Sequence, residues 1–401
     1  MARYMLNRVS SGLLTLFLFV TLLFFLVNML VPGDFVSQFI LTADQAAAMR
    51  EQVGLDRPLH VQYFDWLRSL VTLNLGTSFQ GHEVWESISA ALPSTLLVLA
   101  IGLTLAFTLG GWLGRASAYR GSSLMSGTLT FAAILFLTAF PPALAFAMEE
   151  FLRTRLGFTE LGVFGRIDEQ MWFASDLSPA AVMWRMLGVL ALTFSLIWVL
   201  ERLVRRVLRR RVPRLVFLVM MMGLSLLVWR WMGLTERVFD LAATMTLLLA
   251  GVVLLTFGDV LLVTRAAMDD VLLEDYVMVA RAKGMPERQV RDRHAARAAL
   301  LPVLSRFTVS IPYFMTGLVI LEAVFGGVGA SSGFVSITQQ FFGRPGMGVV
   351  IFDAVRTQDT PMIVGSMLVV GVLTLLLRVA LDVAHAALDP RIRLHGGGDD
   401  D

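Results

Sequence analysis

The sequence predicts an all-α membrane protein of about eight transmembrane helices, and three observations support this. Hydrophobic residues make up 56% of the 401 residues and charged residues only 16%, against roughly 45–50% and 25% in soluble domains. Uncharged runs that are long enough to cross a bilayer core of about 30 Å recur along the chain. Arginine gathers in alternate connections between these runs, which is typical of cytoplasmic loops.

The first apolar run follows Arg3 and Arg8 and ends in Val31-Pro32-Gly33. Because it is long and lacks a small-residue cleavage site, residues 1–31 are expected to form a retained anchor helix and not a signal peptide. The predicted transmembrane runs are Val9–Val31, Ser94–Leu113, Met125–Met148, Met186–Leu200, Leu215–Leu234, Leu241–Thr264, Phe307–Phe325 and Ile363–Ala387.

Positive charge predicts the orientation. The segment Glu201–Arg214 carries seven arginines and is therefore placed in the cytoplasm. Counting crossings then puts the N-terminus, the short loop with Arg115 and Arg120, residues 265–306 and the tail 394–401 on the same side, and these regions are basic or follow basic residues. A multi-pass protein with both termini in the cytoplasm follows.

Four further divisions of the chain are expected. Residues 32–93 should form a folded extracytoplasmic cap, because they carry more acids than bases and Asp44 could cap a helix that begins at Gln45. The apolar positions at helical spacing in this cap are Tyr63, Phe64, Trp66, Leu67 and Leu70. The other divisions are residues 94–185, with helices two and three and an external loop; residues 186–234, an accessory hairpin around the arginine-rich loop; and residues 235–393, the main membrane core.

The third apolar run contains a break at Phe140-Pro141-Pro142. Irregular backbone at membrane depth is tolerated only against protein or a water-filled cavity. Pro141 and Pro142 are thus a candidate pore-lining kink, and a plain bend near the outer surface is the equal alternative.

The long basic loop 265–306 contains two helical pieces. Gly284 can end the first piece in a left-handed conformation, and Pro286 can open the second. The spacing predicts a helix-turn-helix with a charged outer side and an alanine-rich inner side, and such a surface suits a partner protein.

The string from Tyr276 through Ala280-Arg281-Ala282-Lys283-Gly284, with Arg293-His294 and Leu300-Leu301-Pro302 downstream, resembles the EAA loop of ABC importer permeases, specifically the oligopeptide/dipeptide/nickel family. The same family is matched in order by Pro32-Gly33-Asp34, Gly54-Leu55-Asp56-Arg57-Pro58-Leu59, Gln62-Tyr63, Leu75-Gly76-Thr77-Ser78, Glu322-Ala323-Val324-Phe325-Gly326, Pro345-Gly346-Met347-Gly348 and Leu388-Asp389-Pro390-Arg391-Ile392-Arg393. The string from Gly54 to Leu59 resembles the first of the two permease subunits.

This resemblance implies a type I permease core in residues 235–393 with an EAA-type coupling loop at 265–306, in the inner membrane of a prokaryote. It implies a heterodimer with a second permease subunit, two cytoplasmic ATPase subunits, and an extracytoplasmic binding protein that delivers oligopeptides or dipeptides, with nickel chelates and sugars as family alternatives. Membrane lipid is the surrounding partner. The residues implied to couple to the ATPase are Ala280, Arg281, Ala282, Lys283, Gly284, Met285, Pro286 and Glu287.

Other functions find less support in the residues. The chain has no phosphate-binding loop and no metal-ligand spacing, so no cofactor is expected here, and ATP and Mg²⁺ belong to the partner subunits. A net charge of +2 gives no reason to expect nucleic acid. Gly329-Ala330-Ser331-Ser332-Gly333 leaves a serine hydrolase with Ser331 as an alternative, although the strand-to-helix turn of such a site is missing. An ion-coupled secondary carrier is the third class, and Asp259, near a span end, is expected to reach the interface.

The sequence departs from the family pattern in three places. Met278 replaces the glutamate of the general EAA pattern, but the peptide family often lacks this glutamate too, so the loop is expected to work through its shape. The hairpin 186–234 would raise the family's usual six spans to eight without changing the downstream topology. Residues 327–344 interrupt a connection that is normally short, so the shape of the external mouth is open.

Overall fold

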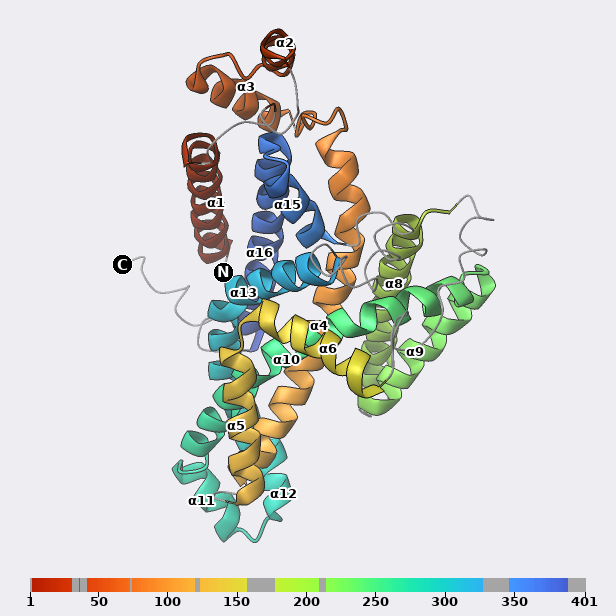
Figure 1. The fold of residues 1–401 in the computed structure, drawn as a ribbon. Helices are drawn as coiled ribbons and strands as arrows, with labels where there is room; N and C mark the ends of the chain where they lie inside the picture. Colours follow the sequence, from red (N-terminus) through yellow and green to blue (C-terminus); the bar gives the residue numbers. More distant parts are fainter. Residues whose placement is uncertain are drawn as a thin grey trace.

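The computed structural model describes residues 2–30, 36, 42–72, 74–119, 123–156, 177–208, 214–326 and 346–388, and these are almost entirely helical (Figure 1). The elements are α1 Ala2–Leu30, α2 Ala43–Val53, α3 Leu59–Val71, α4 Val84–Tyr119, α5 Leu124–Thr138, α6 Pro141–Leu156, α8 Pro179–Leu208, α9 Arg214–Trp231, α10 Thr235–Val271, α11 Asp275–Ala282, α12 Glu287–Gln289, the π-helix η2 Val290–Ala295, α13 Ala296–Gly326, α15 Met347–Arg356 and α16 Thr360–Leu388.

Each of the eight predicted apolar runs lies mostly on helix in the part of the chain that the structure describes, but the runs are not equivalent. In the described residues, six helices are long and apolar enough to cross a membrane, and a seventh crossing results if the pair α5 and α6 counts as one. That pair is bent by 114°, so the third run is not a straight span. The apolar part of α9, Val216–Trp231, is shorter than the others.

Several helices continue beyond the apolar runs that predicted them. The helix α4 begins at Val84, inside the predicted cap, and α10 covers Thr235–Val271 instead of Leu241–Thr264. The helix α8 begins at Pro179, so the hairpin starts before residue 186. Hydropathy marks only the part of a helix that lies in hydrocarbon, and the polar ends add further turns.

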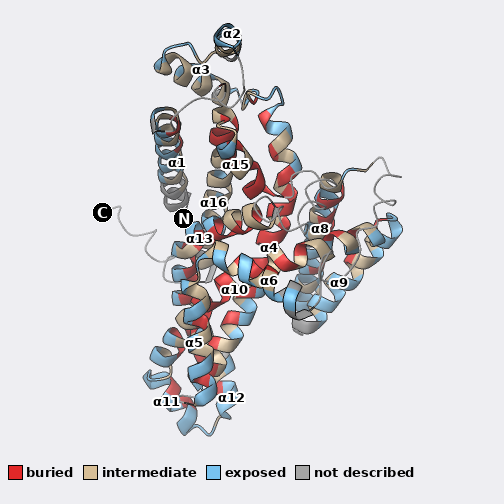
Figure 2. Ribbon diagram, in the orientation of Figure 1, coloured by how far each residue is buried: buried red, intermediate tan, exposed pale blue. Residues whose placement is uncertain are grey.

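The centre of the molecule is the contact between α4, α10 and α13, where buried residues gather (Figure 2). Glycines let α4 and α10 approach closely. A Cβ on Gly110 would lie 2.7 Å from the carbonyl oxygen of Phe257, and one on Gly114 would lie 2.7 Å from that of Leu261. Such close contacts stabilise the packing of membrane helices, because in lipid no hydrophobic effect drives the helices together.

The segment predicted to be a cap contains the helices α2 and α3, which lie at one end of the molecule (Figure 1). The rings of Tyr63 and Trp66 on α3 pack against Phe24 of α1, with centroids 5.4 and 5.7 Å apart. The predicted helix start is wrong by a few residues, because Thr42 is the N-cap and Asp44 lies in the first turn. The aromatic contacts seat the cap on the first membrane helix.

The helices α8 and α9 form the predicted hairpin at the side of the core. Val182, Met183 and Met186, at the start of α8, belong to the main buried cluster, whereas most of the remaining apolar side chains are exposed. The hydroxyl groups of Thr193 and Ser225 join the two helices at 3.0 Å. The buried core contacts of the hairpin are therefore concentrated in the first turns of α8, and Leu187, Leu190 and Trp229 pack against them as partly buried residues.

Candidate functional site: the loop between α10 and α13

The α10–α13 loop (residues 272–295) lies at the end of the molecule opposite the cap (Figure 1). Its helix α11 ends at Ala282, and Gly284 in the turn that follows has φ +70°, which confirms the predicted left-handed conformation. The N–H of Gly284 donates to the Arg281 carbonyl at 2.9 Å, and that of Met285 donates to the Ala280 carbonyl at 3.3 Å. Pro286 stands directly before α12, at its N-cap. The turn is closed by its own backbone.

The inner side of this loop is a small apolar cluster. Val277 and Val290 are fully buried against one another, and Ala280 is 7% exposed beside them. Ala280 shares the buried face of α11 with Val277, so it lies on the alanine-rich inner side, and its predicted role in coupling stays a prediction. Further along, Ala295 and Ala299 pack against Met268 of α10. The loop is thus packed as a unit onto the core helices that precede and follow it.

The remaining predicted coupling residues lie at the surface. Arg281, Ala282, Lys283, Gly284, Pro286 and Glu287 are exposed, and Met285 is partly buried. The guanidinium of Arg281 and the carboxylate of Glu287 form an ion pair at 3.0 Å across the turn. Both side chains are half exposed, so this pair contributes only about 0–1 kcal/mol. Its effect is to brace the turn between α11 and α12.

The outer side of α11 carries apolar side chains that the sequence reasoning missed. We give the name α11 apolar surface to Leu273, in the turn before the helix, together with Tyr276, Met278 and Val279; their exposed fractions are 80%, 43%, 54% and 51%. A charged outer side was expected. The run Val277-Met278-Val279 could have indicated this apolar outer side, because three consecutive apolar residues cannot all face inward on one helix. Partial burial and then the Glu274 carboxylate raise the pKa of Tyr276, so its hydroxyl remains a donor.

The break at Pro141 and Pro142 is sharper than the kink or the plain bend that the sequence predicted. The helix α5 ends at Thr138, and α6 begins at Pro141, so the prolines start a new helix. The hydroxyl of Tyr313 on α13 donates to the Leu137 carbonyl at 3.1 Å and satisfies one of the backbone groups that the break frees. The break therefore lies against α13, and its place in a pore remains a prediction.

Asp259 does not reach the interface. The side chain is 7% exposed, and its Oδ2 accepts a hydrogen bond of 2.7 Å from the Ser310 hydroxyl on α13. The expectation of a snorkelling side chain is wrong because α10 faces α13 at this position. Asp259 instead joins the two core helices.

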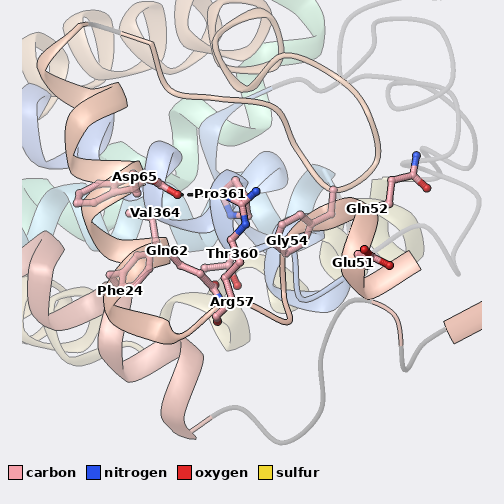
Figure 3. A pocket seen from close by; sticks show the side chains of 12 residues that line it. Phe24, Glu51, Gln52, Gly54, Arg57, Gln62, Asp65, Thr360, Pro361 and Val364 are labelled. Atoms are coloured by element: carbon pink, nitrogen blue, oxygen red, sulfur yellow. Dashed lines mark hydrogen bonds and ion pairs between the residues drawn. The ribbon is translucent and has the colours of Figure 1, made fainter. Parts of the chain in front are cut away.

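A cavity of about 270 Å³ lies on the opposite side of the molecule, between the cap and the start of α16 (Figure 3). Its polar walls include Glu51, and Arg57 and Asp65, which form an ion pair at 3.3 Å; Trp66 and Phe79 supply apolar walls. Ligand pockets usually have about 300–1,000 Å³, so this cavity is slightly smaller than a typical ligand pocket.

The alternative sites gain nothing from the structure. Among the described residues, no group of three or more histidines and acids is placed to hold a metal ion. Ser331 and the surrounding glycines, like the insertion 327–344 and the tail 394–401, lie outside the described residues. The first part of the arginine-rich loop is helical to Leu208, and residues 209–213 are likewise outside.

Comparison with known proteins decides the class. The family described as binding-protein-dependent transport system inner membrane component matches residues 172–394, and the N-terminal model of the same kind of membrane component matches residues 1–99. The chain belongs to this family. It is 30% identical to a putative peptide permease protein of Brucella suis over 98% of this chain and 100% of the relative.

Other relatives in this family have similar coverage. The chain is 28% identical to a dipeptide transport system permease protein of Lactococcus lactis, over 98% of this chain and 100% of the relative. It is 27% identical to an oligopeptide transport system permease protein of Bacillus subtilis, over 98% and 99%. The permease is thus a multi-pass inner-membrane component of a transport system, and the predicted ABC importer family is confirmed.

Proposed function

We propose that this permease is one of two membrane subunits of an ATP-driven importer, and that it takes up oligopeptides or dipeptides delivered by an extracytoplasmic binding protein. The observation that carries the proposal is the α11 apolar surface, which is exposed on a loop that is packed rigidly onto α10 and α13. Exposed apolar side chains that cluster beside charged ones are typical of a protein interface. We infer that a cytoplasmic ATPase covers this surface.

The loop suits the transmission of force. Its turn is fixed by the backbone bonds of Gly284 and Met285 and by the Arg281–Glu287 pair, and its inner cluster leaves little freedom. A displacement of α11 is therefore expected to reach α13 through η2 without loss in the loop itself. ATP and Mg²⁺ are bound by the ATPase subunits, which lie with both chain termini on the cytoplasmic side.

A second permease subunit is expected beside α13 and the α5–α6 break. Val309 and Tyr313 are 64% and 44% exposed on α13, and Phe140 at the break is 68% exposed. We propose that these residues line or border the shared pathway. The peptide substrate is inferred from the names of the relatives, which are peptide, dipeptide and oligopeptide permease proteins.

The test is uptake by the complete complex of both permeases, the ATPases and the binding protein in proteoliposomes. We expect accumulation of a labelled dipeptide or oligopeptide that requires ATP and the binding protein and is insensitive to ionophores. Uptake that is driven by an ion gradient without ATPase subunits would instead establish a secondary carrier. Because the chain has no cysteine, His60→Cys and Lys283→Cys test the orientation, and only the first should label from outside.

The α11 apolar surface can be tested separately. Val279→Asp places a charge in the middle of the surface and should detach the ATPases during co-purification, because an uncompensated charge is costly when it is covered. Gln289→Asp adds the same charge at an exposed position of α12, outside the surface, and should leave the ATPases bound. Equal binding of both variants would exclude this surface as the docking site.

A further inference from the structure

A buried carboxylate near the end of α13 joins this helix to α4 and to the short helix α15. Glu322 is 2% exposed; its Oε1 accepts from the Thr95 hydroxyl of α4 at 2.8 Å, and its Oε2 accepts from the Gly348 N–H of α15 at 2.9 Å. The Thr95 hydroxyl in turn accepts from the Met347 N–H at 2.9 Å. Ionisable groups within the membrane are costly, and their retention usually has a functional reason.

Glycine at two positions makes this joint possible. A Cβ on Gly346 would overlap the Glu322 carboxyl, and one on Gly348 would overlap the Val319 carbonyl oxygen. The start of α15 is therefore held directly on the backbone of α13. Since close packing and hydrogen bonds act together, α15 cannot slide along α13 as two apolar helices could.

The other end of α15 is joined to the cap by a second buried acid. Asp359 is 1% exposed; its Oδ1 accepts from the N–H of Met362 at 3.2 Å and of Phe79 at 3.4 Å, and its Oδ2 accepts from the Ser78 hydroxyl. The Gln80 amide also donates to the Thr357 hydroxyl at 3.3 Å. The segment 78–80 of the cap is thus tied to the turn after α15.

Together these contacts form a continuous line from one end of the molecule to the other. The α10–α13 loop continues into α13, Glu322 holds α15, and Asp359 holds the cap. The geometry points to Glu322 and Asp359 as positioning residues that carry a displacement of the α10–α13 loop to the extracytoplasmic cap. This inference rests on the proposed function and adds the route by which the ATPase state reaches the external face.

The experiment uses the complete complex with one reporter cysteine in the cysteine-free chain. Arg297→Cys reports at the start of α13, and His82→Cys reports on the cap; both side chains are exposed. Thiol-labelling rates are compared with and without ATP and vanadate. We expect ATP to change both rates in the parent, by about fivefold or more if the coupling has the usual size.

Glu322→Gln and Asp359→Asn each keep the shape and replace one acceptor oxygen by an amide donor. In both variants the ATP-dependent change at Arg297→Cys should persist, and the change at His82→Cys should be lost. Ser78→Ala, on the external side, should act in the same way if an acidic variant fails to assemble. Thr193→Val removes a buried hydroxyl pair outside the line and is the matched control.

The outcomes separate the two hypotheses. If the ATP-dependent labelling change at His82→Cys survives in Glu322→Gln and Asp359→Asn, these two residues do not carry the displacement to the cap. The proposed importer function is unaffected by that result. A response that is also lost in Thr193→Val shows general destabilisation and overturns it too. If neither reporter responds to ATP in the parent, the proposed function itself fails.

Discussion

The α10 helix of the core and the α8 helix of the hairpin are similar in composition but differ in packing. Their most apolar windows have mean hydropathies of 2.3 and 1.9, whereas 50% and 17% of those windows are buried inside the chain. Hydropathy therefore assigns both helices to the membrane and does not say which one is surrounded by protein. That information comes from the small residues and from the polar contacts between helices.

Glycine contacts separate the two regions clearly. In the core, a Cβ on Gly102 would lie 3.0 Å from the Val252 side chain, and one on Gly258 would overlap the backbone of Ala133 on α5. In the hairpin, a Cβ on Gly188 or Gly223 would meet nothing within 4 Å. Gly102 and Gly258 are thus required by neighbouring helices, whereas both hairpin glycines, like Gly111 on the outer side of α4, face open space within the chain.

The largest expected effect comes from Gly258→Ala. The added methyl group would overlap the Ala133 carbonyl, so α5 and α10 must separate, at about 1–3 kcal/mol or more. We expect a lower thermal unfolding midpoint in detergent and little assembled complex. Gly223→Ala adds the same group to α9 and should leave the midpoint unchanged. Equal midpoints for the two variants would remove the distinction between core and hairpin.

The next effect concerns the loop that belongs to the core. Gly284 has positive φ and an open environment, so Gly284→Val adds about 1–2 kcal/mol of backbone strain without a clash inside the chain. The permease should still insert and pair with its sister subunit, yet lose substrate-stimulated ATP hydrolysis or its ATPases. Lys283→Ala, at the neighbouring position, should have much less effect. Normal stimulation in Gly284→Val would exclude this loop as the transmission element.

Much of this fold could be predicted from periodicity and from a few special residues. The apolar runs located the membrane helices, and Gly284 and Pro286 located the turn, because hydrophobic length and positive φ have few alternative solutions. The sharp break between α5 and α6 was not predictable in size, since two prolines permit a kink, a bend or a new helix. In the structure a new helix begins at the prolines, and Tyr313 of the distant helix α13 contacts the chain at this break.

The candidate site was predicted less completely, for a related reason. The sequence marked the right loop but could not say that Ala280 faces inward while Met278 and Val279 face outward. Which side of a short helix is buried depends on its neighbours, here Val290 and Met285. Glu322, Gly346 and Gly348 stood in recognised motifs, yet their joint action appears only when α13 and α15 are placed together.

A smaller effect is expected from removing most of the hairpin. Replacing residues 187–232 by a glycine–serine linker keeps Val182, Met183 and Met186 in the main cluster and joins two ends that lie on the same predicted side of the membrane. ATP-driven uptake should be largely retained, because the deletion spares all buried members of the main cluster and removes only partly buried residues packed against it, such as Leu187, Leu190 and Trp229. Loss of uptake in a correctly assembled complex would show that the hairpin belongs to the pathway.

The smallest effect is expected from Thr193→Val, which removes the hydroxyl pair between α8 and α9. Interhelical hydrogen bonds in membranes contribute about 0.6 kcal/mol on average, and Ser225 can turn to a carbonyl of its own helix. Ser117→Ala is the core counterpart, because Ser117 and Ser126 pair at 2.7 Å between α4 and α5. Both variants should lower the unfolding midpoint slightly and equally, since the bond is of the same kind in both regions. A much larger loss in Thr193→Val would mean that the hairpin is held by this contact rather than by its apolar first turns, and that its ordering contributes to the stability of the core.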